Sequence, residues 1–430
     1  MIPAPPMTTE SNRPAPLAAV LAVTFAGSVS GGVFWAAIFF VTARQYGFTP
    51  TGNLVLAAVM GAVYAVTAAG AGRLVRRLSA SSSPRTLLTA ALAVWTLAAI
   101  APLVAPHSEA VLWGGALLGA VASAMSWPIV ESYLSAGRHG AQMRAAIGWF
   151  NVTWTPATAL GLLLLPVVTR IGPLSALALS AAGSFAALVA TFRLPARPGA
   201  HEPEEAQAAV GREYPFLLRA VSWLLPMSYL LCAAMSPLLP HRLAAVSGGT
   251  AGGGVAALWM VARFFTLLAM WRFGFWHGRW GTLVLAAGTL AGGLAVVMLA
   301  PSVTLLAVGL IVFGVGMGLT YYAALYYSLA VGHAAVDAGG AFEALIGFGY
   351  FAGPLLGLGG RALAPPDHGA LATVMLTWLV AGACSLGALS RYRAARRARP
   401  GAAIQTEPSE GSEPPAMSSG GRSPPALDAS

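Results

Sequence analysis

The sequence carries very little charge for its length. Only 9% of its 430 residues are Asp, Glu, Lys or Arg, whereas about a quarter of the residues of a soluble protein are charged. Hydrophobic residues make up 57% of the chain, and the mean hydropathy is +0.72. So few charges cannot cover a soluble surface, and the composition predicts a protein that crosses a membrane many times.

Lysine is absent, and all 24 basic residues are arginine. A nucleotide-binding P-loop and Schiff-base chemistry both need a lysine. The two cysteines, Cys232 and Cys384, lie in separate apolar runs and cannot form a CxxC metal or redox motif. The seven histidines fall outside the predicted spans, so no intramembrane Ser-His or HExxH arrangement is expected. The sequence therefore predicts no enzyme, no cofactor and no metal site.

Three polar stretches divide the apolar sequence. A Pro-rich arm covers residues 1–16, a polar linker residues 194–215, and a basic, then Pro/Ser/Gly-rich tail residues 391–430. The arm lacks the basic start and early cleavage site of a signal peptide, and the arm and the end of the tail are expected to be disordered. Two apolar blocks, 17–193 and 216–390, remain. Each is long enough for six spanning helices of about 20 residues.

The predicted fold class is therefore an all-α membrane protein with twelve transmembrane helices in two six-helix bundles. The predicted spans are 17–43, 53–72, 86–105, 110–134, 145–168, 173–192, 217–238, 252–273, 281–300, 303–329, 341–361 and 370–390. Most arginines then share a side with both termini, which predicts that the termini and the linker are cytoplasmic and that the chain spans the cell membrane, either an inner or a plasma membrane. The net charge of +10 is explained by this topology rather than by nucleic-acid binding.

A weak internal repeat links the two blocks. The fourth span ends in LSAG (134–137) and the tenth in LAVG (329–332), and the next spans begin with RAAIGWF (144–150) and EALIGFG (343–349). Two equivalent six-helix halves joined by a linker are typical of transporters with parallel repeats. Chance similarity between helices rich in Ala, Gly and Leu is the alternative.

Three parts of residues 17–390 resemble the major facilitator superfamily of transporters. GRLVRRLS (72–79) is similar to the family's loop motif G-x-L-a-D-r-x-G, with Arg76 in place of Asp and Ser79 in place of Gly. The eleventh span resembles the family's G-x-x-x-G-P-x-x-G helix motif, which drug–proton antiporters carry in their fifth span. WPIVESYL with GWFNVTW, and ALYYSL with EALIGFG, are similar to segments of uncharacterised bacterial members.

The resemblance implies two pseudo-symmetric bundles and secondary active transport of a small solute by alternating access. It also implies a monomer in the lipid bilayer and a proton or another ion as the coupling species. A drug or metabolite exporter is one alternative. A transporter-like sensor or assembly factor that moves nothing is another.

Ionisable residues within predicted spans are the strongest functional signal, because each costs several kcal/mol unless it is paired or faces water. Arg263 is predicted near the centre of the membrane, with no carboxylate at its depth, and a guanidinium cannot lose its proton. We expect it to bind an anionic group of the substrate. The alternative is that it bonds backbone carbonyls at a helix break. Further candidates for substrate contact, with ordinary packing as their alternative, are Trp35, Trp127, Asn151, Trp154, Tyr321 and Tyr322.

Gating residues are predicted on the cytoplasmic side. Glu131 and Glu343 are expected near the inner interface, where the loop arginines could pair with them as a latch. These arginines are Arg73, Arg76 and Arg77. The alternatives are that Glu343 favours a helix N-terminus and that Glu131 is solvated.

The small residues of the eleventh span predict a hinge, with tight helix packing as the alternative. They are Gly349, Gly353, Pro354 and Gly357.

Overall fold

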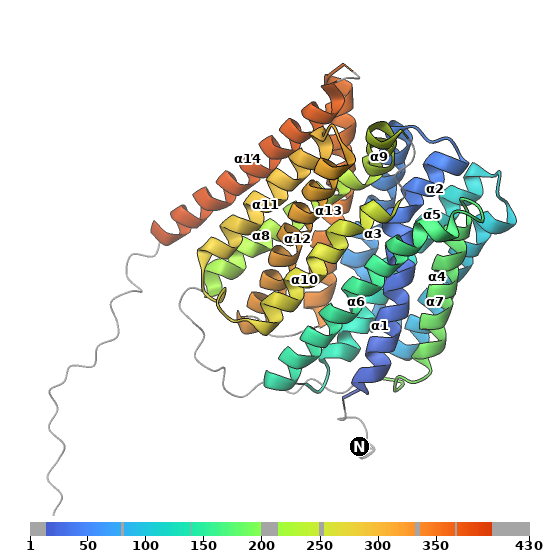
Figure 1. The fold of residues 1–430 in the computed structure, drawn as a ribbon. Coiled ribbons are helices and arrows are strands. Elements are labelled where there is room, and N and C mark those ends of the chain that lie inside the picture. Colours follow the sequence, from blue (N-terminus) through green and yellow to red (C-terminus); the bar gives the residue numbers. More distant parts are fainter. Residues whose placement is uncertain are drawn as a thin grey trace, which may run out of the picture. The chain divides into compact units, whose positions relative to one another are not determined.

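The computed structural model describes residues 14–78, 81–138, 140–198, 214–248, 253–331, 336–365 and 368–397. These residues form helices joined by short loops, and no strand occurs among them. Helices suit this composition because they satisfy their own backbone hydrogen bonds in lipid. The chain divides into two units, Met1–Cys384 and Ser385–Ser430, and the helices of the first are packed side by side (Figure 1).

Six spans come from the first apolar block. The first span is one continuous helix that combines α1 (Leu17–Gly32), a π-helical turn η2 (Val33–Ala37) and α2 (Ile38–Gln45). The other five are α3 (Pro50–Leu78), α4 (Pro84–Val104), α5 (Glu109–Ser135), α6 (Gly140–Val168) and α7 (Ser175–Thr191).

The second block supplies another six. Its first span is α8 (Tyr214–Met235), continued by η3 (Ser236–Leu238) and α9 (Leu239–Ser247), and its second is η4 (Gly253–Ala257) with α10 (Leu258–Arg272). The remaining four are α11 (Trp280–Leu299), α12 (Val303–Val331), α13 (Val336–Leu363) and α14 (Gly369–Arg397).

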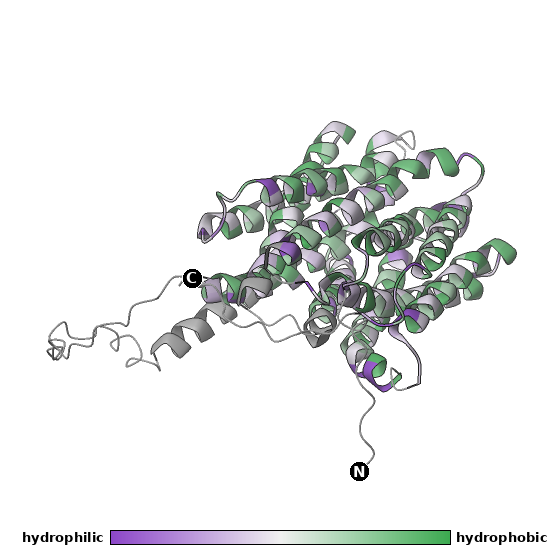
Figure 2. Cartoon of the chain, turned by 90° about the horizontal axis from the view of Figure 1, so that it is seen from below, coloured by the Kyte–Doolittle hydropathy of each residue, from purple (hydrophilic) through white to green (hydrophobic). Residues whose placement is uncertain are grey.

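The predicted fold class is confirmed. Ten of the described helical segments are long and apolar enough to cross a membrane, and Ser175–Thr191 and Gly369–Ala383 are shorter apolar helices. Together they match the twelve predicted spans. Hydrophobic residues cover most of the helices, while the most hydrophilic residues gather near loops and helix ends (Figure 2). The chain is therefore a multi-pass membrane protein.

Helix packing repeats between the two blocks in the same order. In the first block α1 packs on α6, α3 on α5, and α4 on α5; in the second α8 packs on α13, α10 on α12, and α11 on α12. This correspondence agrees with the weak internal repeat in the sequence. We refer to α1–α7 and α8–α14 as the first and second halves. The three predicted polar stretches lie largely outside the described residues, which omit 1–13, 199–213 and 398–430.

Two predicted boundaries are wrong in an informative way. The helix α3 runs on to Leu78, so Arg73, Arg76 and Arg77 lie on a helix and not in a loop. Nothing in RLVRRL breaks a helix, and the next helix begins only where the Ser83 side chain caps α4. After α8 the chain continues in helical turns through α9, which places His241 on a helix instead of in a loop.

Two helix pairs join the halves. In the α3–α13 interface the backbones approach closely, because a Cβ on Gly61 would lie 2.6 Å from the Phe351 nitrogen. In the α6–α10 interface the Trp149 and Trp271 rings meet edge to face, with centroids 5.4 Å apart. These two interfaces flank the cavity described next.

Candidate functional site

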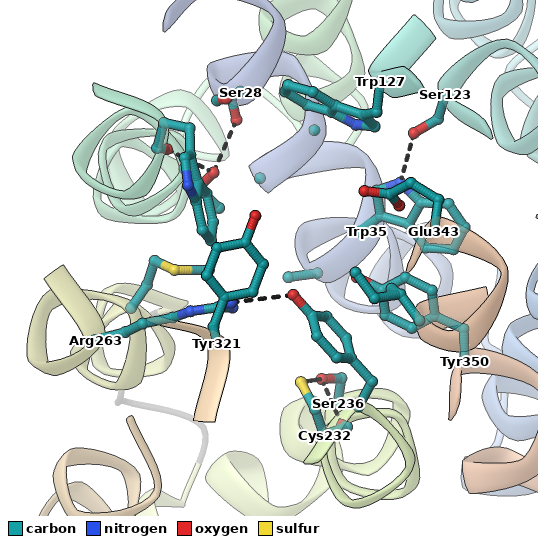
Figure 3. Close-up of a pocket in the computed structure, with 18 of the residues that line it drawn as sticks. Ser28, Trp35, Ser123, Trp127, Cys232, Ser236, Arg263, Tyr321, Glu343 and Tyr350 are labelled. Carbon is teal, nitrogen blue, oxygen red and sulfur yellow. Dashed lines mark hydrogen bonds between the residues drawn. The ribbon is translucent and has the colours of Figure 1, made fainter. Parts of the chain in front are cut away.

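A cavity of about 930 Å³, part of it open to solvent, lies between the two halves. Its lining comes from α1, η2, α3, α5 and α6 of the first half, and from α8, η3, α10, α12 and α13 of the second. Arg263 and Tyr321 line one side, and Trp35, Glu343 and Tyr350 line the opposite side (Figure 3).

Arg263 is buried in an aromatic box on one side of the cavity. Its side chain is 1% exposed, and its NH2 group donates a hydrogen bond to the Tyr229 hydroxyl at 3.0 Å. The guanidinium carbon lies 4.6 Å from the Trp154 ring centroid, 4.8 Å from that of Tyr321 and 5.6 Å from that of Tyr229. Ring faces stabilise a desolvated cation by about 2 kcal/mol. We call these four residues the arginine wall.

The arginine wall does not neutralise its own charge. No described carboxylate forms an ion pair with Arg263, and its Nε atom is buried without a hydrogen-bond partner. The alternative of backbone carbonyls at a helix break is not what the structure shows, since the hydrogen bond goes to a tyrosine hydroxyl. A buried guanidinium keeps its proton, so the wall presents a permanent positive charge.

The carboxylates Glu131 and Glu343 line the same cavity. Glu343 is 7% exposed and accepts a short hydrogen bond from the Tyr64 hydroxyl across the α3–α13 interface. Glu131 reaches the cavity from α5, close enough to Glu343 for the two charges to interact. We call Glu131, Glu343 and Tyr64 the carboxylate wall.

The structure corrects the expected place of Glu343 in its helix. The sequence placed Glu343 at the start of the eleventh span, but α13 begins earlier, at Val336. Glu343 therefore lies about 10 Å inside the helix, and not at its N-terminus, at a rise of 1.5 Å per residue. Glu131 lies near the end of α5, and both carboxylates line the same cavity as Arg263, so their position near the inner interface stays a prediction.

A row of aromatic rings connects the two walls. Tyr350 meets the Tyr229 ring edge to face at 5.4 Å and the Tyr64 ring at 5.7 Å. Trp35, from the π-helical turn, stacks on Tyr350 with centroids 4.8 Å apart and donates a hydrogen bond to Ser123 at 3.2 Å. We call Tyr229, Tyr350, Tyr64 and Trp35 the aromatic row; its first and third members also belong to the two walls.

The predicted substrate-contact residues separate into two groups. Arg263, Trp35, Trp127, Trp154 and Tyr321 are among the cavity-lining residues. Asn151 and Tyr322 are not: Asn151 accepts a hydrogen bond from Trp154 Nε1 at 2.9 Å, and Tyr322 packs against Trp276 at 5.6 Å. Asn151 thus holds a ring of the arginine wall, and Tyr322 belongs to the packing of the second half.

The arginines of α3 lie far from the carboxylates in this conformation. Arg76 follows Tyr64, the partner of Glu343, by twelve residues, which is about 18 Å along a helix. Among the described residues, neither Arg73 nor Arg77 forms a hydrogen bond with either carboxylate. The latch stays a prediction for another state of the protein.

The glycines of α13 lie at close helix contacts. A Cβ on Gly349 would come within 2.7 Å of the Leu230 nitrogen of α8, and Gly353 faces the same helix. Gly357 lies against Leu54 of α3, and α13 remains one helix through Pro354. These contacts agree with tight packing, and a hinge at this position stays a prediction.

Sequence reasoning missed the tyrosines that organise the site. Tyr64, Tyr229 and Tyr350 each lie well inside a predicted span. A hydroxyl at such a depth needs a polar partner or water. That requirement is the signal by which they could have been found.

Comparison with known proteins shows likeness in structure only. No family model and no curated protein match the sequence. A bacterial homologue of the human lysosomal transporter Spinster superposes with a TM-score of 0.60 at 13% identity, covering 86% of this chain and 96% of that chain. A proton-dependent oligopeptide transporter gives 0.64 at 12% identity, with 89% and 98% covered.

The nucleoside transporter NupG is a third such structure, with a TM-score of 0.61, 12% identity, and 88% of this chain and 99% of that chain covered. At these identities the likeness concerns the fold and not the substrate. The chain has the fold of major facilitator transporters.

Proposed function

We propose that this protein is a secondary active transporter that moves a small solute by alternating access between its two halves. The position of the cavity supports this, because both halves contribute to its lining. A rocking motion of one half against the other would open the same site to each side of the membrane in turn. The fold neighbours named as transporters also support it.

The substrate that we propose carries an anionic group bound by Arg263. The observation that carries this proposal is the arginine wall: a 1% exposed guanidinium, held by three rings, with a buried Nε that has no partner. A carboxylate or a similar anion could use the planar fork of the arginine. Such contacts are strong where water is excluded.

A proton is the coupling species that we favour. Glu131 and Glu343 both face the cavity, and neighbouring carboxylates can share a proton. The solute and the proton would then occupy one cavity, so that binding of one can depend on the other.

Both termini and the 194–215 linker are proposed to be cytoplasmic. In the first half, the Arg138 guanidinium donates to the carbonyl of Ala15, and the Tyr133 hydroxyl donates to that of Pro195 at 2.9 Å. The start of the first span and the start of the linker therefore lie at the same end of the bundle. Reporters that are active on one side of the membrane only, fused after Pro195 and after Pro400, test the orientation. Activity of an outside reporter at either point would refute it.

Transport by purified protein in liposomes is the decisive experiment. A metabolite library is first screened by thermal shift, and each stabilising compound is then tested for uptake under an imposed pH gradient. We expect a compound with an anionic group to accumulate, Arg263→Ala to abolish its uptake, and Arg263→Lys to weaken its binding. Arg272→Ala is the matched control, because Arg272 lies on the same helix outside the cavity lining.

Several outcomes would contradict the proposal. Normal uptake by Arg263→Ala, or a purely cationic substrate, would refute the role of Arg263. A compound that stabilises the protein and never accumulates would indicate a sensor and not a transporter.

A further inference from the structure

The two walls of the cavity hold a guanidinium on one side and two carboxyl groups on the other, groups that can carry opposite charges and are not paired with each other. Arg263 bonds to Tyr229, and Glu343 accepts from Tyr64, so each charge has a neutral tyrosine as its hydrogen-bond partner. An isolated charge in a low-dielectric interior is costly unless a counter-charge or water compensates it. Each wall therefore has capacity for an ionic partner of the opposite sign.

The aromatic row keeps the opposite charges apart. Two ring-to-ring steps, of 5.4 Å from Tyr229 to Tyr350 and 5.7 Å from Tyr350 to Tyr64, lie between the residues that hold Arg263 and Glu343. Figure 3 shows the two charged side chains on opposite sides of the cavity. The rings between them offer apolar surface and hydroxyl groups, and no further charge.

We propose, on the basis of the transport function above, that the transported solute is amphoteric. It carries an anionic group that binds Arg263 and, at the other end of an apolar stem, a protonated amine that binds Glu131 and Glu343. One molecule then compensates both walls at once, with its stem along the aromatic row. The aromatic ring faces beside the carboxylates also stabilise the protonated amine by cation–π interaction.

A solute of one charge fits this cavity less well. An anion bound to Arg263 shares the cavity with two carboxylates, and a cation bound to the carboxylates shares it with Arg263. An amphoteric solute adds no net charge and meets an opposite charge at each end. The cavity holds two carboxylates and one guanidinium, so one negative charge remains when such a solute is bound. A coupling proton can neutralise it by binding to one of the carboxylates.

The separation of the arginine wall from the carboxylate wall predicts a preferred length for the solute. An α-amino acid carries both of its charged groups on one carbon atom, whereas the walls are separated by the aromatic row. The preferred solute should therefore have several bonds between its amine and its acid.

Equilibrium binding to the purified full-length protein tests the inference without any gradient. The probes are ω-amino acids of graded length, from β-alanine to aminododecanoate, each compared with the carboxylate and the amine of the same length. We expect affinity to peak at an intermediate length. At the peak the ω-amino acid should bind at least about tenfold more tightly than either matched compound, as expected for a charge-assisted bond to a buried group.

A native thiol reports whether the probe occupies this cavity. Cys232 lines the cavity, and the chain has only one other cysteine. In a Cys384→Ser background, a probe bound along the aromatic row should slow alkylation of Cys232 by a maleimide. Binding without this protection would place the probe elsewhere and would overturn the inference.

Conservative variants separate the two ends of the solute. Glu343→Gln and Glu131→Gln should remove the advantage of the ω-amino acid over the matched carboxylate, while carboxylate binding persists. Arg263→Lys should weaken binding of the ω-amino acid and of the matched carboxylate, and should leave binding of the matched amine unchanged. Glu109→Gln is the matched control, because Glu109 begins the same helix as Glu131 and is not among the cavity-lining residues.

The inference and the transport proposal fail differently. If matched carboxylates bind as tightly as ω-amino acids to the wild-type protein, the amphoteric inference is wrong, while transport of an anionic solute still stands. If the Gln variants keep the full preference for the ω-amino acid, the carboxylates do not bind the amine. If the matched amines bind as tightly as the ω-amino acids, and Arg263→Lys changes the affinity of neither, both the inference and the role of Arg263 as an anionic anchor are wrong.

Discussion

The two interfaces between the halves differ in what holds them together. The α3–α13 interface depends on small residues: Gly61 lies against the backbone of Tyr350 and Phe351, and a Cβ on Gly347 would come 2.7 Å from the Ala65 Cα. The α6–α10 interface depends on aromatic rings, with Trp154 over Arg263 and Trp149 against Trp271. One interface is a contact of backbones, and the other a contact of side chains.

Each interface also brings one charge to the cavity. Glu343 is fixed at the first by a hydrogen bond to Tyr64, and Arg263 is fixed at the second by the face of Trp154. Movement of the halves would therefore change both walls of the site. The difference in packing predicts that the α3–α13 interface tolerates substitution less well than the α6–α10 interface, because side chains can shift and packed backbones cannot.

The largest expected effect is that of Gly61→Leu. The new side chain would have to occupy space taken by the backbone of α13, where a Cβ alone would come within 2.6 Å of the Phe351 nitrogen. We expect a loss of stability of about 1–3 kcal/mol or more, measured as a lower melting temperature and less monodisperse protein.

Gly70→Leu is the matched control for Gly61→Leu. Gly70 lies on the same helix, α3, but is exposed, and a Cβ there would meet nothing within 4 Å. The variant should fold as the wild type does. Equal losses in the two variants would mean that close approach at Gly61 does not hold the halves together.

A smaller effect is expected from Tyr64→Phe. The variant removes the donor to the buried carboxylate of Glu343 and keeps the ring in the aromatic row. Loss of a hydrogen bond to a buried charged group costs about 1–3 kcal/mol, seen as a lower melting temperature. Tyr350→Phe is the control, because no hydrogen bond of its hydroxyl is found among the described residues. If both variants lose the same stability, the bond to Glu343 is not the reason.

The sequence predicted the architecture more completely than the site. Twelve spans follow from apolar length alone, since spanning a membrane is a property of each segment by itself. Arg263 was found because an arginine cannot become neutral in lipid. The place of Glu343 within its helix was wrong because α13 begins earlier than the sequence indicated, and the shared cavity of Glu131, Glu343 and Arg263 depends on which helices surround it.

Contacts between side chains explain the other residue roles that could not be predicted from the sequence. Asn151 was predicted to touch the substrate because it is polar and within a span, but its Oδ1 accepts from Trp154. Tyr229 was not singled out, although its hydroxyl accepts a hydrogen bond from Arg263 and its ring lies 5.6 Å from the guanidinium carbon. Such roles depend on contacts between helices that are far apart in sequence.

Gly148→Ala tests the side-chain interface. The new methyl group would overlap the Trp271 ring, which lies in the last turn of α10 and is only partly buried. Because a ring can move aside more easily than a backbone, we expect a loss of about 1 kcal/mol, below that of Gly61→Leu. The double variant Gly148→Ala/Trp271→Ala should show no further cost from the methyl group, as a double-mutant cycle measures. A loss as large as that of Gly61→Leu would remove the contrast between the interfaces.

The smallest effect is expected from Asn151→Ala. It deletes the acceptor of the Trp154 indole, at 2.9 Å, and leaves every cavity-lining side chain in place. A neutral hydrogen bond contributes about 1 kcal/mol, so the melting temperature should fall only slightly. Trp154 would then hold Arg263 less firmly, and affinity for the anionic end of the solute should fall several-fold. Thr153→Ala is the control, because among the described residues the Thr153 hydroxyl donates to the backbone carbonyl of Trp149 in its own helix and to no other group. If Asn151→Ala loses stability and no affinity, Asn151 supports the helix and not the arginine wall.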